Sequence, residues 1–316
     1  MILKKLTAAF GLLLLTPCAF AQKKDPPPPP PLIGRWDLVV SRKDGKVPSW
    51  LEVTLSGRKT LVGRFVGAFG SARPISEVSY NSGRFGFSIP VQFEDGDTDI
   101  RVEGDIANDT LSGTISGPYF GRSEFTGKRA PKLVRTKPPV WGKPVELFNG
   151  KNLDGWKARN PKENNGWVVR DGYLSNDKPG NDLITVGKYT DFKVHAEFRY
   201  PKGSNSGIYL RGRYEAQIED NYGLEPDPHI IGCIYGFLQP RINAAKKPGE
   251  WQSYDLTIVG REVTISLNGQ LVVFRQEIPG ITGGAIDSEE GEPGPLLIQG
   301  DHGTVQFRKI TITPAN

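Results

Sequence analysis

Residues 208–219 read Ile-Tyr-Leu-Arg-Gly-Arg-Tyr-Glu-Ala-Gln-Ile-Glu, with an apolar side chain at nearly every second position. The apolar row comprises Ile208, Leu210, Tyr214, Ala216 and Ile218, and the opposite row comprises Tyr209, Arg211, Arg213, Glu215, Gln217 and Glu219. Because successive side chains of a β-strand point to opposite faces, this spacing predicts strands with one buried and one polar face. Gly212 interrupts the run, and a break there would separate Arg211 from Glu215.

The same two-residue period recurs on both sides of this stretch. Phe192, Val194, Ala196 and Phe198 alternate with polar residues, and Asn268-Gly269 is typical of a hairpin turn. Many strands without helical periodicity predict a two-sheet sandwich or jelly roll in the C-terminal half. Short strands between residues 36 and 115, separated by Gly and Asn/Asp turns, predict a small antiparallel β-barrel or curled sheet before it. The expected fold class is all-β.

Composition supports this fold class and excludes some functions. The 38 Gly and 26 Pro among 316 residues disfavour long helices. The length suggests about two domains. The formal charge of +5 falls to +3 if the segment carrying Lys4 and Lys5 is removed, and it is scattered along the chain. So weak a charge predicts no nucleic-acid partner.

The N-terminus has the pattern of an export signal. Lys4 and Lys5 precede an apolar run at 6–15, and Ala19-Phe20-Ala21 precedes Gln22. This layout predicts a secretory signal peptide over residues 1–21, because the apolar run is too short to span a membrane. We therefore expect a secreted or periplasmic protein with no transmembrane segment. Lipidation at Cys18 is a minor alternative, since Pro17 fits a lipoprotein signal poorly.

Proline-rich stretches divide the rest of the chain. Pro26–Pro31 predicts a stiff spacer over residues 22–31, and a second linker is expected at 131–144. The predicted domains are therefore 32–130, of unknown role, and 145–316. Cys233 would be the only cysteine left after cleavage, and its apolar neighbours favour a buried thiol.

The motifs of the second domain are recognisable. They include Leu147-Phe148-Asn149-Gly150, Asn205-Ser206-Gly207-Ile208-Tyr209-Leu210-Arg211, Tyr214-Glu215-Ala216-Gln217-Ile218-Glu219-Asp220 and Gln299-Gly300-Asp301-His302-Gly303. In their order and extent, residues 145–312 resemble the 3-keto-disaccharide hydrolase domain family, whose members have a concanavalin A-like jelly roll. One departure is Lys309, where the family usually has Asn. The resemblance does not include residues 32–130.

The resemblance implies a sugar or oligosaccharide substrate whose C3 hydroxyl an upstream sugar 3-dehydrogenase has oxidised to a ketone. A ketone at C3 acidifies the C2 hydrogen, so the group on C1 can leave by β-elimination, and water can then add. This chemistry needs a base near C2, a donor near the C3 oxygen and an acid near the leaving oxygen.

Several polar residues could fill these roles. Glu215 is the candidate base, and His302, in a glycine-flanked turn, is the candidate acid or base because its pKa lies nearest neutrality. Candidate substrate-binding residues are Asn205, Tyr209, Arg211, Gln217, Tyr235, Gln299, His195 and Glu197. Each has an alternative interpretation as a solvated strand or turn residue, or, for the tyrosines, as part of the core.

The sequence leaves open whether the protein binds a metal ion. No cofactor is firmly predicted, although Asp220, Asp301 and His302 are possible ligands for a divalent metal ion, which would polarise the ketone. They could equally form turns.

The sequence suggests two rival functions. A non-catalytic, lectin-like carbohydrate-binding protein would bind sugars in the same kind of concave groove, lined by the polar row of residues 209–219. A conventional laminarinase-type glycosidase would need a Glu-x-Asp-x-x-Glu strand, and Gln217 and Asp220 occupy the positions of its Asp and second Glu, so that reading is rejected.

Overall fold

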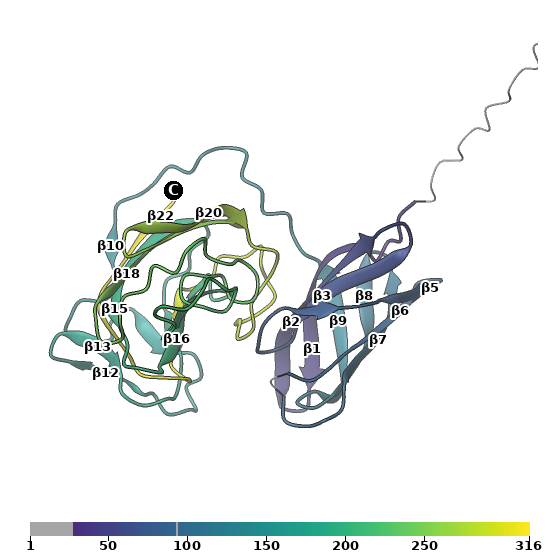
Figure 1. Cartoon of the computed structure of the whole chain (residues 1–316), viewed down its shortest axis with the longest axis horizontal. Helices are drawn as coiled ribbons and strands as arrows, with labels where there is room; N and C mark the ends of the chain where they lie inside the picture. Colours follow the sequence, from purple (N-terminus) through teal and green to yellow (C-terminus); the bar gives the residue numbers. More distant parts are fainter. Residues whose placement is uncertain (1–27, 93) are drawn as a thin grey trace, which may run out of the picture. The chain divides into compact units, whose positions relative to one another are not determined.

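The computed structural model describes residues 28–92 and 94–316. The predicted signal peptide, the alternative at Cys18 and the spacer up to residue 27 lie outside the described residues. Residues 1–30 and residues 31–316 are separate units, and the second unit contains all of the strands that the structure describes. Its regular secondary structure is entirely β-strand, which confirms the expected all-β class (Figure 1). In the described part of the chain, no helix is long and apolar enough to cross a membrane.

The first sheet is a nine-stranded antiparallel meander, in the order β4-β3-β2-β1-β9-β8-β7-β6-β5. Its strands are β1 (Gly34–Arg42), β2 (Gly45–Ser56), β3 (Thr60–Val66), β4 (Arg73–Ile75), β5 (Ser79–Asn81), β6 (Arg84–Ile89), β7 (Ile100–Ala107), β8 (Thr110–Gly117) and β9 (Gly121–Arg129). β4 also lies close to β6, so the sheet curls on itself around an apolar core that includes Trp36 and Leu38. This is the expected barrel or curled sheet, called the barrel below.

The turns of the barrel follow from residue chemistry. Asn108 and Asp109 join β7 to β8 with φ of 48° and 58°. Two consecutive positive φ angles are typical of the type I′ turn, whose twist matches that of the flanking strands, and Asn and Asp tolerate this conformation well.

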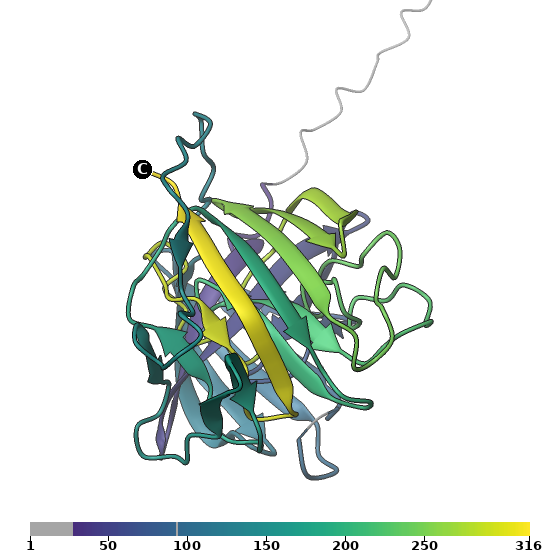
Figure 2. The same ribbon diagram turned by 90° about the vertical axis from the view of Figure 1, so that its left-hand side faces the viewer.

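The remaining strands form two sheets, called the sandwich below. One holds β10 (Val145–Glu146), β12 (Trp167–Arg170), β13 (Tyr173–Asn176), β15 (Phe192–Arg199), β18 (Gln252–Val259), β19 (Glu262–Leu267), β20 (Gln270–Glu277) and β22 (Val305–Pro314). The other holds β11 (Trp156–Ala158), β14 (Leu183–Thr185), β16 (Asn205–Leu210), β17 (Tyr214–Glu219) and β21 (Leu297–Ile298). Figure 2 shows the long β22, in yellow, which pairs with β10, β13 and β15.

The apolar rows predicted from the sequence meet in one core. Phe192 and Phe198 of β15 pack in the same buried cluster as Ile208 of β16 and Ala216 of β17. Burial of a large apolar side chain contributes roughly 1.5–3 kcal/mol, so this cluster holds the two sheets together. The predicted hairpin at Asn268-Gly269 is confirmed, because it joins β19 to β20 with both residues at positive φ.

β16 and β17 are buried on both faces, although their side-chain pattern predicted one buried and one polar face. Tyr209, Glu215 and Gln217, on the face away from the core, are each less than 5% exposed. Two loops cover this face: Tyr235 donates its backbone N–H to the Glu215 carbonyl, and Thr282 donates to the Arg213 carbonyl. The polar row therefore lies beneath these loops.

Barrel and sandwich contact each other through both apolar and polar groups. Trp50 of β2 and Val66 of β3 belong to the sandwich core cluster. The Ser288 hydroxyl donates to the Leu38 carbonyl over 2.6 Å. These contacts fix barrel residues beside the loops that cover β16 and β17.

Candidate functional site

A cavity of about 500 Å³ lies over the polar face of β16 and β17. It is lined by Phe69, Gly70, Asn205, Tyr209, Glu215, Gln217, Tyr235, Gly283, Gly284, Gln299, Asp301 and His302. Eight of these residues were predicted as catalytic, sugar-binding or possible metal-binding residues, and they come from strands and loops far apart in the sequence. The structure therefore brings most of the predicted site together in one place.

Glu215 is the buried carboxyl group of this cavity. It is 4% exposed, and burial raises its pKa to about 8, against the opposing effects of Tyr209 and His302. Gly207 on the neighbouring strand makes room for it: a Cβ there would lie 2.6 Å from Glu215 Oε1. A carboxylate with a pKa near 8 is a far stronger base than an exposed one, and it is poised near neutral pH.

His302 faces the same cavity from the turn after β21. Its Nδ1 lies 2.5 Å from Asp301 Oδ1, and this hydrogen bond is the largest cause that raises the pKa of His302. The Glu215 carboxylate adds a smaller contribution in the same direction. The imidazole therefore keeps its proton more readily than a free histidine, as a general acid requires.

Further polar groups surround this pair. Tyr209 donates its hydroxyl to the Gly283 carbonyl over 3.0 Å, and burial raises its pKa well above the usual value. Burial, with the Glu215 charge, raises the pKa of Tyr235 to about 12, so its half-buried hydroxyl stays a donor. Gln299 Oε1 is buried and has no hydrogen-bond partner within residues 28–92 and 94–316. Such an acceptor is costly unless a ligand hydroxyl or a water molecule donates to it.

Arg211 lies outside the cavity, which corrects its prediction as a sugar-binding residue. Arg211 and Gly212 adopt φ of 54° and 66°, so the chain turns between β16 and β17 and the alternation restarts. The Arg211 guanidinium is completely buried and donates to the Gly260 carbonyl over 2.6 Å. The guanidinium therefore stabilises the fold and does not line the cavity.

His195 and Glu197 are likewise not brought to the cavity. Both lie on β15 in the other sheet, where His195 Nδ1 is 2.8 Å from Asp255 and Glu197 pairs with Arg308. The sequence correctly predicted that both residues lie on the polar face of a strand. That face is on the sheet that contains β15, not on the sheet that carries the cavity. They do not join Glu215 and His302.

The possible metal ligands do not converge. Asp220 accepts a hydrogen bond from the Gly203 N–H over 2.9 Å, whereas Asp301 is paired with His302. Among residues 28–92 and 94–316, no group of three or more His, Cys, Asp or Glu side chains is arranged to hold a metal ion. The predicted set of three therefore does not fit a metal site.

Some residues of the site were not predicted. Asp182 is buried beside the cavity, accepting the Gly300 N–H over 2.9 Å and pairing with Arg159 over 3.0 Å. Burial raises its pKa. Phe69 and Gly70 come from the barrel, more than 230 residues before His302, and no local pattern marks them.

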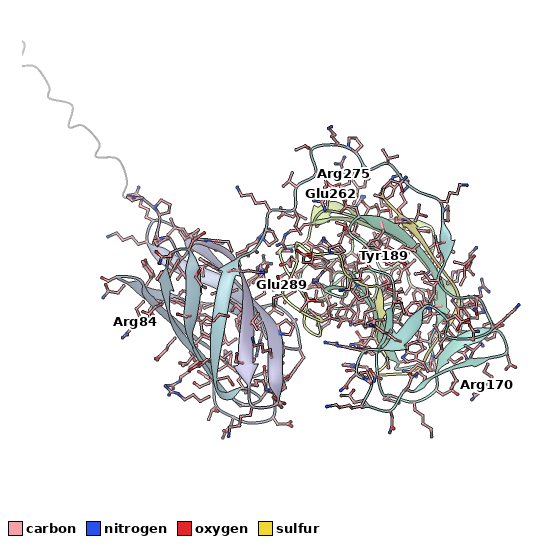
Figure 3. The ribbon with its side chains drawn as sticks, turned by 180° about the vertical axis from the view of Figure 1, so that it is seen from behind. Arg84, Arg170, Tyr189, Glu262, Arg275 and Glu289 are labelled. Atoms are coloured by element: carbon pink, nitrogen blue, oxygen red, sulfur yellow. The ribbon has the colours of Figure 1, made fainter. Side chains whose placement is uncertain are left out.

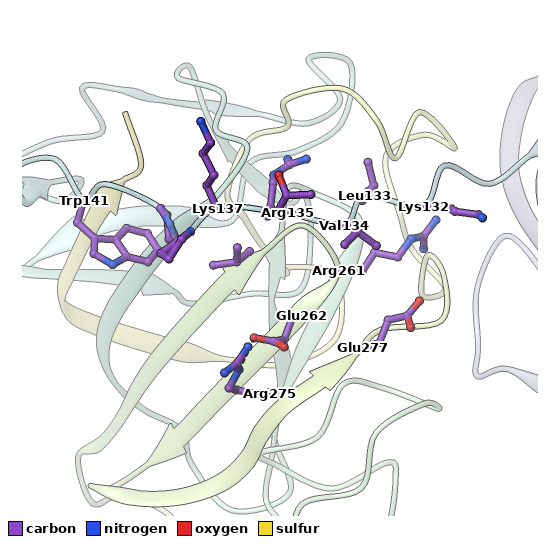
Figure 4. Close-up of a pocket in the computed structure, with 14 residues that line it drawn as sticks. Lys132, Leu133, Val134, Arg135, Lys137, Trp141, Arg261, Glu262, Arg275 and Glu277 are labelled. Atoms are coloured by element: carbon purple, nitrogen blue, oxygen red, sulfur yellow. Dashed lines mark hydrogen bonds and ion pairs between the residues drawn. The ribbon is translucent and has the colours of Figure 1, made fainter.

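A second cavity, of about 620 Å³, lies beneath the linker (Figure 4). Its lining carboxylates are already paired: Glu262 with Arg275 over 2.7 Å, and Glu277 with Arg35. Figure 3 shows Glu262 and Arg275 beside each other at the surface. Both carboxylates are exposed and already paired with an arginine, so this cavity offers no counterpart of the buried Glu215 beside His302.

Comparisons with known proteins agree with the resemblance found in the sequence. Residues 143–313 match the family model described as the 3-keto-alpha-glucoside-1,2-lyase-like domain. A 97-residue segment is 33% identical to a 3-keto-disaccharide hydrolase of Bacteroides thetaiotaomicron, covering 26% of this chain and 32% of that protein. The match thus spans about a third of the length of that relative.

Solved structures include two presumed glycosyl hydrolases from Parabacteroides distasonis. One is 29% identical, with a TM-score of 0.48, covering 57% of this chain and 92% of that chain. The other is 23% identical, with a TM-score of 0.45, covering 55% and 94%. Because the family model takes in more than half of the residues, including Glu215 and His302, this chain belongs to the 3-keto-alpha-glucoside-1,2-lyase-like domain family.

Proposed function

We propose that this protein cleaves 3-keto-glycosides, with Glu215 as the base and His302 as the acid. The observation that carries the proposal is a carboxyl group, only 4% exposed and with a pKa of about 8, that shares a cavity with a histidine of raised pKa. Enzymes place such groups where protons are moved near neutral pH. Membership of the family supports the choice of a 3-keto-glycoside as substrate.

In the first step, the Glu215 carboxylate removes the proton from C2 of the sugar. The electron pair of the C2–H bond passes into the C3 ketone as an enolate. It then returns to form the C1–C2 double bond while the C1–O bond breaks. His302 gives its Nε2 proton to the departing oxygen, so that the leaving group departs as a neutral alcohol.

In the second step, water adds to the unsaturated ketone. The water oxygen bonds to C1, one water proton returns to His302, and Glu215 gives its proton to C2. The sum is hydrolysis, and both side chains recover their first state. Tyr235 and Asn205 border the cavity and supply donors for the C3 oxygen and ring hydroxyls, and Gln299 Oε1 accepts from a hydroxyl.

The cellular setting belongs to the same proposal. The pattern of residues 1–21 supports export to the periplasm or outside the cell. A substrate with a C3 ketone requires an oxidation upstream, and a sugar 3-dehydrogenase is the class of enzyme that would supply it.

The test is turnover of a 3-keto-glucoside and of its unoxidised parent. We expect the wild type to release the alcohol only from the keto sugar, with a slower rate when C2 carries deuterium. Glu215→Gln keeps the side-chain size but removes the base, so kcat is expected to fall by about 10²–10⁴. Glu262→Gln, on the other sheet, is the matched control and should retain full turnover.

Three outcomes would contradict the proposal. Equal cleavage of the unoxidised parent would exclude elimination through the ketone. Full activity of Glu215→Gln would exclude this base. Binding of sugars without turnover of either compound would favour the lectin-like alternative.

A further inference from the structure

The cavity wall includes residues outside the family match. Phe69 and Gly70 lie in the loop between β3 and β4 of the barrel, whereas the family model begins at residue 143. Neither the proposed acid–base pair nor the family match gives the barrel a role. The loop therefore needs its own explanation.

Backbone contacts hold this loop against the sandwich. The Gly284 N–H donates to the Ala68 carbonyl over 2.9 Å. A Cβ on Gly283 would lie 2.2 Å from the Gly70 oxygen, and one on Gly236 would lie 2.8 Å from the Ala72 nitrogen. Only glycine permits such close approach of two backbones. The loop is thus fixed from two sides.

The same contacts connect the loop to the proposed catalytic pair. The Gly283 carbonyl, beside Gly70, accepts the hydroxyl of Tyr209, and Tyr209 in turn interacts with Glu215. The barrel loop therefore lies next to the residues that position the base. It forms a side of the cavity and is not a distant appendage.

Phe69 itself has the properties of a sugar platform. Its ring is only partly buried and lines the cavity, and its edge-to-face contact with Tyr119, at 4.5 Å between ring centroids, fixes its orientation. Tyr119 is fixed in turn by the Arg42 guanidinium, 3.7 Å from its ring centroid. The apolar C–H face of a pyranose packs well against such a partly exposed ring.

We propose that Phe69 of the barrel is a substrate-positioning and specificity-determining residue, which packs against a sugar ring of the 3-keto-glycoside. This inference rests on the proposed function for its ligand. It assigns the barrel a role in completing the site, because the sandwich alone would leave this side of the cavity open.

The experiment compares the full-length wild type with Phe69→Ala, Phe69→Trp and Phe274→Ala. Phe274 is 56% exposed on β20 and does not line the cavity, so it is the matched control. Steady-state kinetics on a 3-keto-disaccharide give KM and kcat. Calorimetric titration with the same sugar, in a Glu215→Gln background, gives Kd without turnover. Thermal melting checks the fold of each variant.

We expect Phe69→Ala to raise KM and Kd about tenfold, equivalent to about 1.4 kcal/mol, with kcat changed far less. Phe69→Trp should stay within about threefold of wild type, because it restores a flat ring. Phe274→Ala should match the wild type. A merely structural role would instead lower Tm and kcat together and leave Kd unchanged.

The outcomes separate this inference from the proposed function. If the wild type cleaves the keto sugar and Phe69→Ala has unchanged KM and Kd, the inference is overturned and the function stands. If the wild type binds the sugar without cleaving it, the function fails, and a tenfold weaker Kd of Phe69→Ala still supports the inference. If the wild type neither binds nor cleaves it, both are overturned.

Discussion

Glu215 shows how one buried residue acquires a property that its free amino acid lacks. Loss of water around the carboxylate disfavours its charged form, and Asp301 and Asp182 add negative charge nearby. His302 and the Tyr209 hydroxyl act in the opposite direction, which keeps the pKa at about 8 instead of higher. The balance suits a base that must both take up and release a proton in one catalytic cycle.

The pH dependence of activity follows from these shifts. Below about pH 8 Glu215 carries its proton in the folded protein, so kcat/KM should rise as pH increases toward that value. The reaction also needs the proton on His302, whose pKa is raised by Asp301, so kcat/KM should fall as pH increases through the pKa of His302. A bell-shaped profile of kcat/KM against pH is expected, with apparent pKa values that belong to the coupled pair.

The profile of His302→Gln provides the control. This variant should be slower and should lack the alkaline limb, while it keeps the acidic limb of Glu215. An unchanged alkaline limb in His302→Gln would assign that limb to another group.

At the scale of elements, β16 and β17 carry the site because both of their faces are buried. One face packs in the sandwich core, and the other forms the floor of the cavity under two loops. A residue on β16 can therefore change the site without weakening the core. Gly207 is such a residue, since its φ is not in the left-handed region and its missing Cβ leaves room for Glu215.

Gly207→Ala tests whether the space beside Gly207 is needed to place the Glu215 carboxyl group. The added Cβ would lie 2.6 Å from Glu215 Oε1 and 3.0 Å from its Cγ, so the carboxyl group must move. We expect turnover to fall at least tenfold while Tm stays near the wild-type value, because alanine is otherwise tolerated in a strand.

Gly291→Ala is the matched control for this variant. Its Cβ would meet only Pro131, at an ordinary 3.8 Å, and activity should be unchanged. Full activity of Gly207→Ala would mean that the position of the Glu215 carboxyl group is not critical.

At the scale of the whole molecule, a buried carboxyl pair joins the barrel to the sandwich. Asp37 of β1 interacts with Glu290, which also accepts the Tyr214 hydroxyl over 2.5 Å and pairs with Arg261. Burial, with Glu290, raises the pKa of Asp37 to about 9. In the described chain, both Asp37 oxygens and Glu290 Oε1 lack a donor, and a proton shared between the two carboxyl groups supplies one.

Stability should therefore decline as pH rises through this range. The folded state keeps the Asp37 proton up to about pH 9, whereas the unfolded chain releases it near pH 4. Because the unfolded state binds fewer protons between these values, this group lowers the free energy of unfolding by up to about 1.4 kcal/mol per pH unit.

The Asp37→Asn variant has a side chain that cannot ionise at this position. Comparing it with the wild type isolates the effect of Asp37 on the free energy of unfolding. Denaturant titrations between pH 5 and pH 9 should show that the variant gains stability relative to the wild type as pH increases. Parallel curves for the two proteins would exclude the proton-sharing pair. Asp44→Asn, at an exposed position, is the control and should run parallel to the wild type.

The sequence by itself determined the all-β class, the strand alternation, the hairpin at Asn268-Gly269 and the family. These features depend on neighbouring residues, through side-chain periodicity, turn chemistry and motif order. Glu215, Gln217 and His302 were predicted as site residues because they occur in motifs that the sequence contains. Local information was sufficient for each of them.

Only the tertiary structure decided which polar residues share the cavity. The left-handed turn at Arg211–Gly212 directs the Arg211 guanidinium into the interior, and His195 lies on the other sheet, although both matched the same alternating pattern. Phe69 reaches the site because glycine backbones of the barrel and the sandwich approach closely. Long-range packing sets the positions of Arg211, His195 and Phe69. An alternating strand pattern shows which side chains share a face, but it does not show which other part of the protein packs against that face.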